Sequence, residues 1–176
     1  MNEILGVTSI SLKAMLVIDR HPLHESLNKK LMMESLDADY SISGTTNVKA
    51  QRSQWSTKSP TIKIIQRWVE SIITSHYNIY SRGYKFSYNG SWFVRYSKGD
   101  YTISHHHIPA SYAFIYFIRS PIGSSPLVFS TSDTIIEPEE GKLIIFPGNL
   151  FHHVPKNECD GRIVFSGNII PDMDSL

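Results

Sequence analysis

The 176-residue sequence predicts a mainly β fold, in which antiparallel strands form a sandwich or barrel that follows N-terminal helices. From residue 84 onward, short apolar and aromatic runs alternate with Gly, Pro, Ser and Asp turns, without helical stretches between them. Such spacing is typical of antiparallel sandwiches and barrels. Earlier in the chain, apolar residues recur at three- and four-residue spacing, as on one face of a helix. We therefore expect one domain over 1–176, with helical wrapping at 1–80 and a β core at 81–171.

The N-terminal part is expected to hold one strand and two helices. Residues 12–18 (LKAMLVI) are apolar enough for a strand. A helix starting at Pro22 and running to about residue 36 is indicated by leucines at every fourth position: Leu23, Leu27 and Leu31. A second helix begins at Pro60, with Ser59 as its N-cap. Its apolar stripe, expected to pack on the outside of a sheet, is Ile62, Ile65, Trp68, Val69, Ile72 and Ile73.

The segment between these helices is polar and basic. Residues 41–69 hold no acidic side chain but five basic ones: Lys49, Arg52, Lys58, Lys63 and Arg67. Residues 41–59 also lack helical periodicity. Two interpretations remain open: a solvated basic loop and helix face, or a substrate-facing loop in which Arg52 and Trp55 contact an anionic or planar group.

The β core is expected to begin with a hairpin. Aromatic residues alternate at Tyr84, Phe86 and Tyr88, and the pair Asn89-Gly90 that follows is the strongest short-range hairpin signal. The return strand would be SWFVRY. Further strands are indicated by TISHHH, SYAFIYFIR, PLVFS, KLIIF, FHHV and RIVFSGNII.

Five of the eight histidines lie in this β core: His105, His106, His107, His152 and His153. Because strand side chains alternate, His105 and His107 face the same side and His106 faces away. A third histidine from a distant strand would complete a set of three nitrogen ligands, and imidazole suits zinc, copper, iron and nickel. Spacing alone leaves the choice between His152 and His153 open. Arg162, ten residues after His152, has a planar guanidinium that can bind a carboxylate through two hydrogen bonds.

Composition and charge narrow the function classes. The net charge of +1 gives no reason to expect a nucleic-acid-binding surface. No apolar run approaches the length of a membrane span, and the N-terminus does not resemble a signal peptide. Cys159 is the only cysteine, so we expect a reducing compartment: the cytoplasm, or a host cytoplasm if the gene is phage-borne. There is no phosphate-cradling glycine loop, and Cys159 lies in a polar turn that is poor for a nucleophile.

The histidine motifs resemble the cupin pattern. The two matching pieces are GDYTISHHH at 99–107 and GKLIIFPGNLFH at 141–152. The chain departs from that pattern because no Glu follows His107 at the cupin spacing and because Asn149 stands where a glycine is expected.

Over about residues 84–170 the chain more closely resembles the Fe(II)- and 2-oxoglutarate-dependent oxygenases, in particular the small ones of phage and marine bacterial genomes related to the prolyl-hydroxylase type. The matching pieces are WFVRYSKGDY, the His-x-His, SYAFIYFI, PLVF, EPEEGKLIIFPGNLFHHV and RIVFSGN. This resemblance implies a double-stranded β-helix, or jelly roll, that uses Fe(II), 2-oxoglutarate and O₂.

The same resemblance implies the roles of five residues. His105, His107 and His152 would bind the metal. Arg162 would bind the distal carboxylate of 2-oxoglutarate, and Tyr96 would hydrogen-bond the same co-substrate. His107 is a departure, since most such oxygenases have Asp or Glu there, and a neutral imidazole leaves the metal one unit more positive. Two acidic residues are alternative ligands, although turns are their expected place: Asp100 and Asp133.

We therefore predict a hydroxylase-type oxygenase that acts on an unidentified substrate, with a homodimer left open. One alternative is a cupin-like three-His metalloprotein or dioxygenase that does not use 2-oxoglutarate. The other is a non-enzymatic, phage-type jelly-roll protein, which would bind no metal. Arg162 separates the first two interpretations, because only the first requires it for co-substrate binding.

Overall fold

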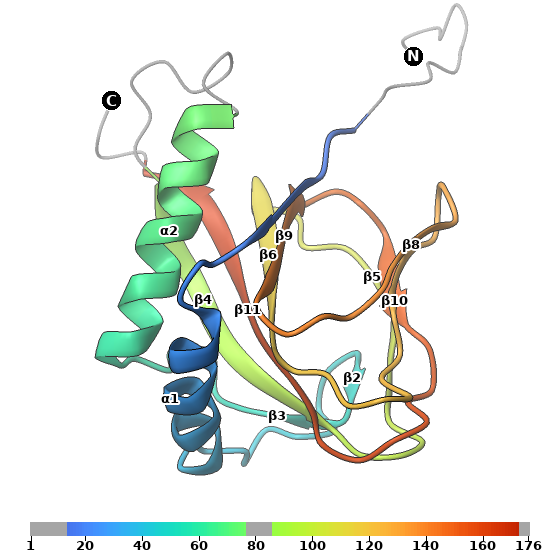
Figure 1. Ribbon diagram of the computed structural model, residues 1–176. Coiled ribbons are helices and arrows are strands. Elements are labelled where there is room, and N and C mark those ends of the chain that lie inside the picture. Colours follow the sequence, from blue (N-terminus) through green and yellow to red (C-terminus); the bar gives the residue numbers. More distant parts are fainter. Residues whose placement is uncertain (1–13, 77–85, 173–176) are drawn as a thin grey trace, which may run out of the picture.

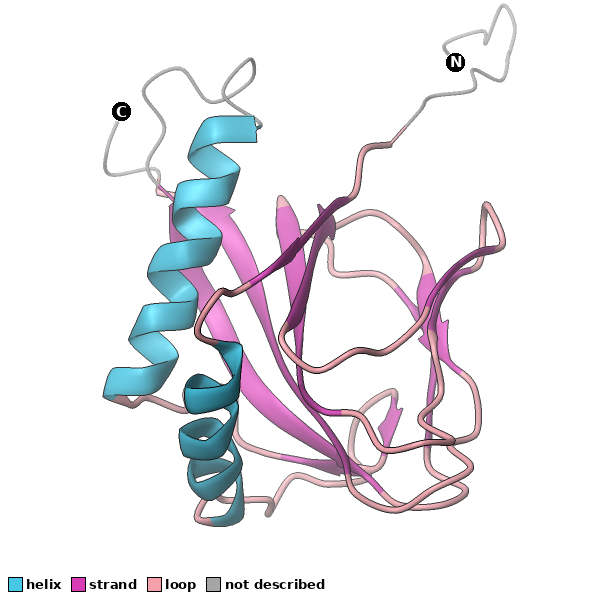
Figure 2. Cartoon of the chain, in the orientation of Figure 1, coloured by secondary structure: helices cyan, strands magenta, loops and turns pink. Residues whose placement is uncertain are grey.

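The computed structural model describes residues 14–76 and 86–172, so residues 12 and 13 of the first expected strand, and Tyr84, lie outside the described residues. Two antiparallel sheets face each other, and two helices cover the outer side of one sheet (Figures 1 and 2). This arrangement is the double-stranded β-helix, or jelly roll, that the sequence predicts.

The larger sheet has six strands in the order β1-β9-β6-β11-β4-β3. Their bounds are β1 Val17–Arg20, β3 Gln51–Arg52, β4 Phe86–Tyr96, β6 Tyr112–Arg119, β9 Lys142–Pro147 and β11 Arg162–Pro171. The smaller sheet has five strands in the order β2-β5-β10-β7-β8. Their bounds are β2 Val48–Lys49, β5 Tyr101–His105, β7 Leu127–Phe129, β8 Thr134–Ile136 and β10 His152–Val154.

Helices α1 (His24–Leu36) and α2 (Pro60–His76) pack against the outer face of the six-stranded sheet (Figure 1). The predicted start of α2 is confirmed, because the Ser59 hydroxyl accepts a hydrogen bond of 3.0 Å from the Ile62 N–H. The predicted stripe of α2 is buried, apart from the half-buried Trp68. Helix α1 begins two residues later than predicted, and Leu23 is 65% exposed because it precedes the helix instead of facing the sheet.

Strand alternation divides the apolar residues between two cores. Along β11, Ile163 and Phe165 face the helices, whereas Val164 faces the space between the sheets. The second core fills that space with residues from both sheets, including Phe117 of β6 and Phe129 of β7. Alternate residues of β11 therefore point toward the interior of the jelly roll, which is where Arg162 is directed.

The hairpin predicted at Asn89-Gly90 is wrong. Residues 86–96 form one continuous strand, β4, which pairs with the ten-residue β11 along its length. The register against β11 shifts between Gly167 and Ile169, so the Asn89-Gly90 pair forms a bulge instead of a turn. Gly90 has a φ of +115°, which explains why the local signal resembles a turn. The long-range pairing with β11 overrides that signal.

Other differences concern short elements. The first strand begins at Val17, later than the predicted run 12–18. The polar segment 41–59 is not helical, but it carries the two-residue strands β2 and β3, and β8 was not predicted at all. In the part of the chain that the structure describes, neither helix has both the length and the apolar character needed to span a membrane.

Candidate metal centre and co-substrate cavity

Three histidines from two neighbouring strands converge at one end of the jelly-roll interior. His105 is the last residue of β5, and His152, the first residue of β10, is its direct partner in the register. His107 lies two residues beyond β5, where its N–H donates a 2.7 Å hydrogen bond to the Gly148 carbonyl. The potential ligand atoms of the three rings all lie within 4.8 Å of one another, and Nε2 of His107 lies 3.3 Å from Nε2 of His152.

Backbone carbonyls orient two of these rings. Nδ1 of His105 lies 2.9 Å from the Ile103 carbonyl, and Nδ1 of His152 lies 3.0 Å from the Leu150 carbonyl. A ring nitrogen that donates to a carbonyl carries the proton, which leaves the lone pair on Nε2. Both rings therefore present Nε2 to the centre of the cluster, which is the state in which imidazole binds a metal.

Burial keeps the cluster neutral. Burial, together with the neighbouring His152 and His105, lowers the pKa of His107 to about 2. Burial and the neighbouring His105 lower the pKa of His152 to about 3, and burial also lowers the pKa of His105. Metal ligation requires deprotonated imidazole, so the three rings are in the binding form without a change of charge.

The neighbouring histidines and the candidate carboxylates lie elsewhere. His106 is exposed and its ring lies edge-on to Phe151, and Nδ1 of His153 lies 3.0 Å from the Ser130 hydroxyl. The Asp100 carboxylate accepts a hydrogen bond from the Ser97 N–H in a turn, and Asp133 is an exposed turn residue. Among the described residues, the donor cluster thus consists of three imidazoles and no carboxylate.

Arg162 and Tyr96 form a pair across β11 and β4. They are direct partners in the register, and the Arg162 guanidinium carbon lies 4.4 Å from the centroid of the Tyr96 ring. Only 1% of Arg162 is exposed, and its Nε and Nη1 groups are buried without a hydrogen-bond partner in the described part of the chain. Burial lowers the pKa of Arg162, an effect that Tyr96 opposes. A buried guanidinium with free N–H groups is the receptor that a carboxylate requires.

The histidines and Arg162 share one cavity between the two sheets. Its lining includes the three histidines, Tyr96 and Arg162. The cavity is narrow, with a volume of about 40 Å³, which is room for about three water molecules. A larger ligand therefore requires lining side chains to shift.

Several solved structures with the same architecture are 2-oxoglutarate oxygenases or prolyl hydroxylases. The viral collagen prolyl hydroxylase of Paramecium bursaria Chlorella virus 1, in its 2-oxoglutarate complex, has a TM-score of 0.72 and 16% identity over 88% of this chain and 94% of its own. A 2OG-Fe(II) oxygenase family oxidoreductase from Burkholderia pseudomallei has a TM-score of 0.66 and 9% identity, over 88% and 84%. The chain has the fold of the 2OG-Fe(II) oxygenases.

A prolyl hydroxylase from Trichoplax adhaerens, in complex with a hypoxia-inducible-factor peptide fragment, shares this oxygenase fold. Its TM-score is 0.65 and its identity is 15%, over 87% of this chain and 82% of its own. Comparison of the sequence with models of known families and with the sequences of characterised proteins gave no match.

Within the oxygenase fold, the two residues suggested as substrate contacts lie outside the metal cavity. Arg52 is only 1% exposed, which contradicts a fully solvated loop, and Trp55 is 47% exposed. Trp92 lines the cavity instead, and its ring lies 6.3 Å from that of His107. The sequence analysis missed Trp92, although the signal was present: it alternates with Tyr96 at even spacing along the same strand and so faces the same side.

Proposed function

We propose that this protein is an Fe(II)- and 2-oxoglutarate-dependent oxygenase of the hydroxylase type. The observation that carries the proposal is the shared cavity, in which three converging imidazoles and the unpartnered guanidinium of Arg162 face the same space. A set of three histidines that can bind a metal occurs in many classes of protein, and a buried arginine often has only a structural role. Their combination suits a ligand that chelates a metal at one end and carries a carboxylate at the other. The oxygenase fold supports the same conclusion.

The residues present fit the metal that this function requires. Three neutral nitrogen donors suit iron, and also zinc, copper and nickel. His105, His107 and His152 would hold the ion through Nε2, leaving further coordination positions open. When bound, Fe(II) and 2-oxoglutarate supply the oxidising chemistry with O₂, and the protein supplies orientation and exclusion of water.

The co-substrate would be held from its other end. One of the two unpartnered N–H groups of Arg162, Nε or Nη1, would donate to the distal carboxylate, and the Tyr96 ring supports the guanidinium from one face. The Tyr96 hydroxyl shares a 2.7 Å hydrogen bond with the Thr102 hydroxyl, which holds that ring in place. Since the three imidazoles are neutral, the negative charges of the co-substrate would offset the positive charge of the metal.

Anaerobic titration of the metal-free protein with Fe(II) and then with 2-oxoglutarate tests the proposal. We expect a visible metal-to-ligand charge-transfer band that appears only after 2-oxoglutarate is added. Glutarate is the control, because it keeps both carboxylates but lacks the 2-oxo group and should give no band. Failure to bind Fe(II) would refute the metal centre.

A second function is favoured by one specific observation, the histidine at position 107 in place of a carboxylate. Three-His sites suit a cupin-like dioxygenase that does not use 2-oxoglutarate. In the same titration, that function predicts Fe(II) binding without the band. The unpartnered Arg162 favours the first function, since a three-His dioxygenase without 2-oxoglutarate leaves the buried guanidinium without an anion.

A further inference from the structure

We propose that Arg52, held between Trp55 and Trp92, anchors a carboxylate of the substrate beside the metal cavity. This inference rests on the proposed oxygenase function, because it assigns the substrate class of that same cavity. The chemical class is an organic acid or an acidic peptide, in which the carboxylate lies at a distance from the carbon that reacts.

The guanidinium of Arg52 lies in a corner formed by two indoles. Its central carbon is 3.5 Å from the centroid of the Trp55 ring and 4.5 Å from that of the Trp92 ring. The two indoles meet edge to face, with centroids 4.9 Å apart and an interplanar angle of 72°. Arg52 belongs to the edge strand β3 and pairs with Val94 of β4. Aromatic rings on two sides hold the guanidinium in one place, so its free N–H groups have a defined direction.

Arg52 carries a buried charge without a counter-ion. Nη1 donates a 3.1 Å hydrogen bond to the Ser53 carbonyl, but Nη2 is buried and has no partner in the described part of the chain. The ion pairs found among those residues involve Glu139 and not Arg52. Burial lowers the pKa of Arg52 to about 10, so the group is still protonated at neutral pH. An uncompensated buried charge with an unused donor is a costly arrangement that a bound anion would relieve.

The same features occur at Arg162, and the two arginines are the largest fully buried side chains in the described residues. Each is 1% exposed, each has an unpartnered N–H, and each lies over an aromatic ring. The distal carboxylate of 2-oxoglutarate accounts for Arg162 under the proposed function. Arg52 requires a second anion, and the substrate is the remaining ligand. We assign a carboxylate because a flat anion matches the flat fork of a guanidinium between rings.

Trp92 connects this anchor to the reaction centre. Trp92 lines the metal cavity, where its ring lies 6.3 Å from the ring of His107. The same ring also contacts the guanidinium of Arg52. Trp55 covers the outer side of Arg52 and is 47% exposed. The Trp55 backbone is fixed by a 2.7 Å hydrogen bond from the Ser91 N–H to its carbonyl. Access of a ligand to Nη2 would therefore require the indole to turn about its own side-chain bonds while the backbone stays in place.

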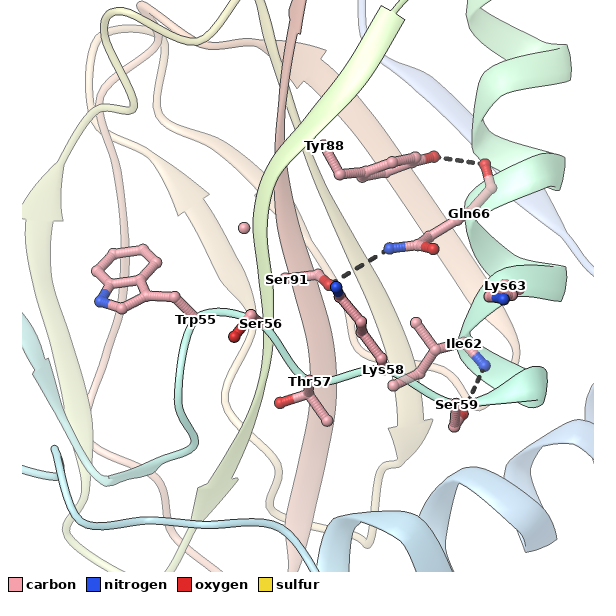
Figure 3. Close-up of a pocket in the computed structure, with 11 residues that line it drawn as sticks. Trp55, Ser56, Thr57, Lys58, Ser59, Ile62, Lys63, Gln66, Tyr88 and Ser91 are labelled. Carbon is pink, nitrogen blue, oxygen red and sulfur yellow. Dashed lines mark hydrogen bonds between the residues drawn. The ribbon is translucent and has the colours of Figure 1, made fainter.

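The larger pocket nearby is a weaker candidate for the same anion. It has a volume of about 370 Å³ between α2, β4 and the segment 55–59, and the Trp55 indole points away from its other labelled residues, across β4 (Figure 3). The buried polar side chain in its lining, Ser91, already has a partner, because Gln66 Nε2 donates to its hydroxyl. That pocket therefore lacks the orphan donor that singles out Arg52.

The test uses the whole protein and small probes of known charge. Benzoate and its uncharged counterpart benzamide are titrated into ¹⁵N-labelled protein, with the arginine Nε–H signals as the NMR readout, before and after loading with Zn(II) and 2-oxoglutarate. Two capped tripeptides, Ala-Asp-Ala and Ala-Asn-Ala, form a second arm that separates a free organic acid from an acidic peptide. The variants are Arg52→Gln, Arg52→Lys and the matched control Arg95→Gln, from the neighbouring strand.

We expect the carboxylate probe to shift the Arg52 signal and to bind roughly tenfold more tightly than its uncharged counterpart, as a charge-assisted pair requires. Arg52→Gln should remove that preference, Arg52→Lys should weaken it, and Arg95→Gln should leave it unchanged. If Arg52 only supports the fold, its variants will lower the melting temperature while carboxylate binding stays as in the wild type, which overturns the proposal. Absence of any carboxylate preference in the wild type overturns it as well.

The anion site and the oxygenase function are tested by different measurements, so that one can fail without the other. The Fe(II) and 2-oxoglutarate titration reports on the histidines and Arg162, whereas the NMR titration follows the Arg52 Nε–H signal separately from that of Arg162, and loading with Zn(II) and 2-oxoglutarate occupies Arg162. A missing charge-transfer band with a normal carboxylate preference would therefore refute the oxygenase function and keep the anion site. The reverse pattern would refute the anion site only. If Arg52→Gln fails to fold, Arg52→Lys, which keeps the charge and the stem, carries the comparison.

Discussion

Replacement of Arg162 by methionine should weaken 2-oxoglutarate binding strongly without harming the fold. The side chain is 1% exposed, and its Nε and Nη1 groups have no partner in the described residues. Because these two N–H groups point in different directions, one carboxylate can accept from only one of them, in a charge-assisted hydrogen bond of about 1.5–3 kcal/mol. Its loss corresponds to an increase in Kd of roughly 10- to 150-fold.

The Arg162→Met variant, although it binds 2-oxoglutarate more weakly, should be at least as stable as the wild type when no ligand is present. Among the described residues Arg162 has no counter-ion for its buried charge, and methionine fills much of the same volume without a charge. Replacement of buried charged groups by apolar ones of similar size is often neutral or stabilising by about 1–4 kcal/mol. We therefore expect Arg162→Met to unfold at the same temperature as the wild type or at a higher one when no ligand is present.

Two assays check this pair of effects. The charge-transfer band, followed during anaerobic 2-oxoglutarate titration of Fe(II)-loaded protein, gives the Kd, and thermal unfolding with and without 2-oxoglutarate gives the stability. Arg95→Met is the control, because Arg95 is half-buried on β4 and is not part of the cavity lining. A Kd within a few-fold of the wild type, or a large loss of stability in Arg162→Met, would refute the reasoning, since either result makes Arg162 a structural residue.

Three further variants test the site and the fold. His105→Ala should reduce Fe(II) affinity by at least about 100-fold, because two ligands replace three, whereas His106→Ala, which changes the exposed neighbour, should bind Fe(II) normally. Isothermal titration measures both affinities, and equal values would exclude the cluster as the metal site. Gly90→Ala should cost about 1–3 kcal/mol in urea unfolding, because φ is +115° and a Cβ would lie 3.2 Å from the Trp55 carbonyl oxygen; unchanged stability would contradict the strained bulge. Ser59→Ala should cost about 1 kcal/mol, because the Ile62 N–H loses its cap; a Ser59→Thr control, which keeps the hydroxyl that also donates to the Glu34 carboxylate, should retain most of the stability, and an equal loss in both variants would argue against capping.

The elements that the sequence predicted well are those with strong local signals. Helix α2 has a cap, a proline at its first position and a long apolar stripe, and the structure confirms all three. The even spacing of the histidine pair predicted that His105 and His107 face one side, and they do, even though β5 ends at His105. The same alternation explains why Ile163 and Phe165 of β11 face the helices while Val164 faces the space between the sheets.

The errors arose where long-range pairing outweighs a local signal. Asn89-Gly90 favours a tight turn, but β11 offers backbone partners on both sides of this pair, and a continuous strand satisfies more hydrogen bonds than a hairpin would. For Arg52 the sequence left two interpretations open, a solvated loop and a substrate-facing one, and its burial contradicts the first. Its burial depends on Trp55 and Trp92, and only one of these lies near it in the sequence.

The candidate ligand atoms and the shared faces of the strands could be predicted from the sequence alone. Residue type sets which atoms can bind a metal or a carboxylate, and strand periodicity sets which residues share a face. The tertiary structure brings His152 and not His153 to the cluster, as the family resemblance implied and as spacing alone could not decide. Among the described residues, no carboxylate joins the cluster and two arginines are buried without counter-ions, and the sequence could not predict either outcome. These outcomes depend on which strands pair and in what register, and burial of both faces of the larger sheet selects that register over the whole chain.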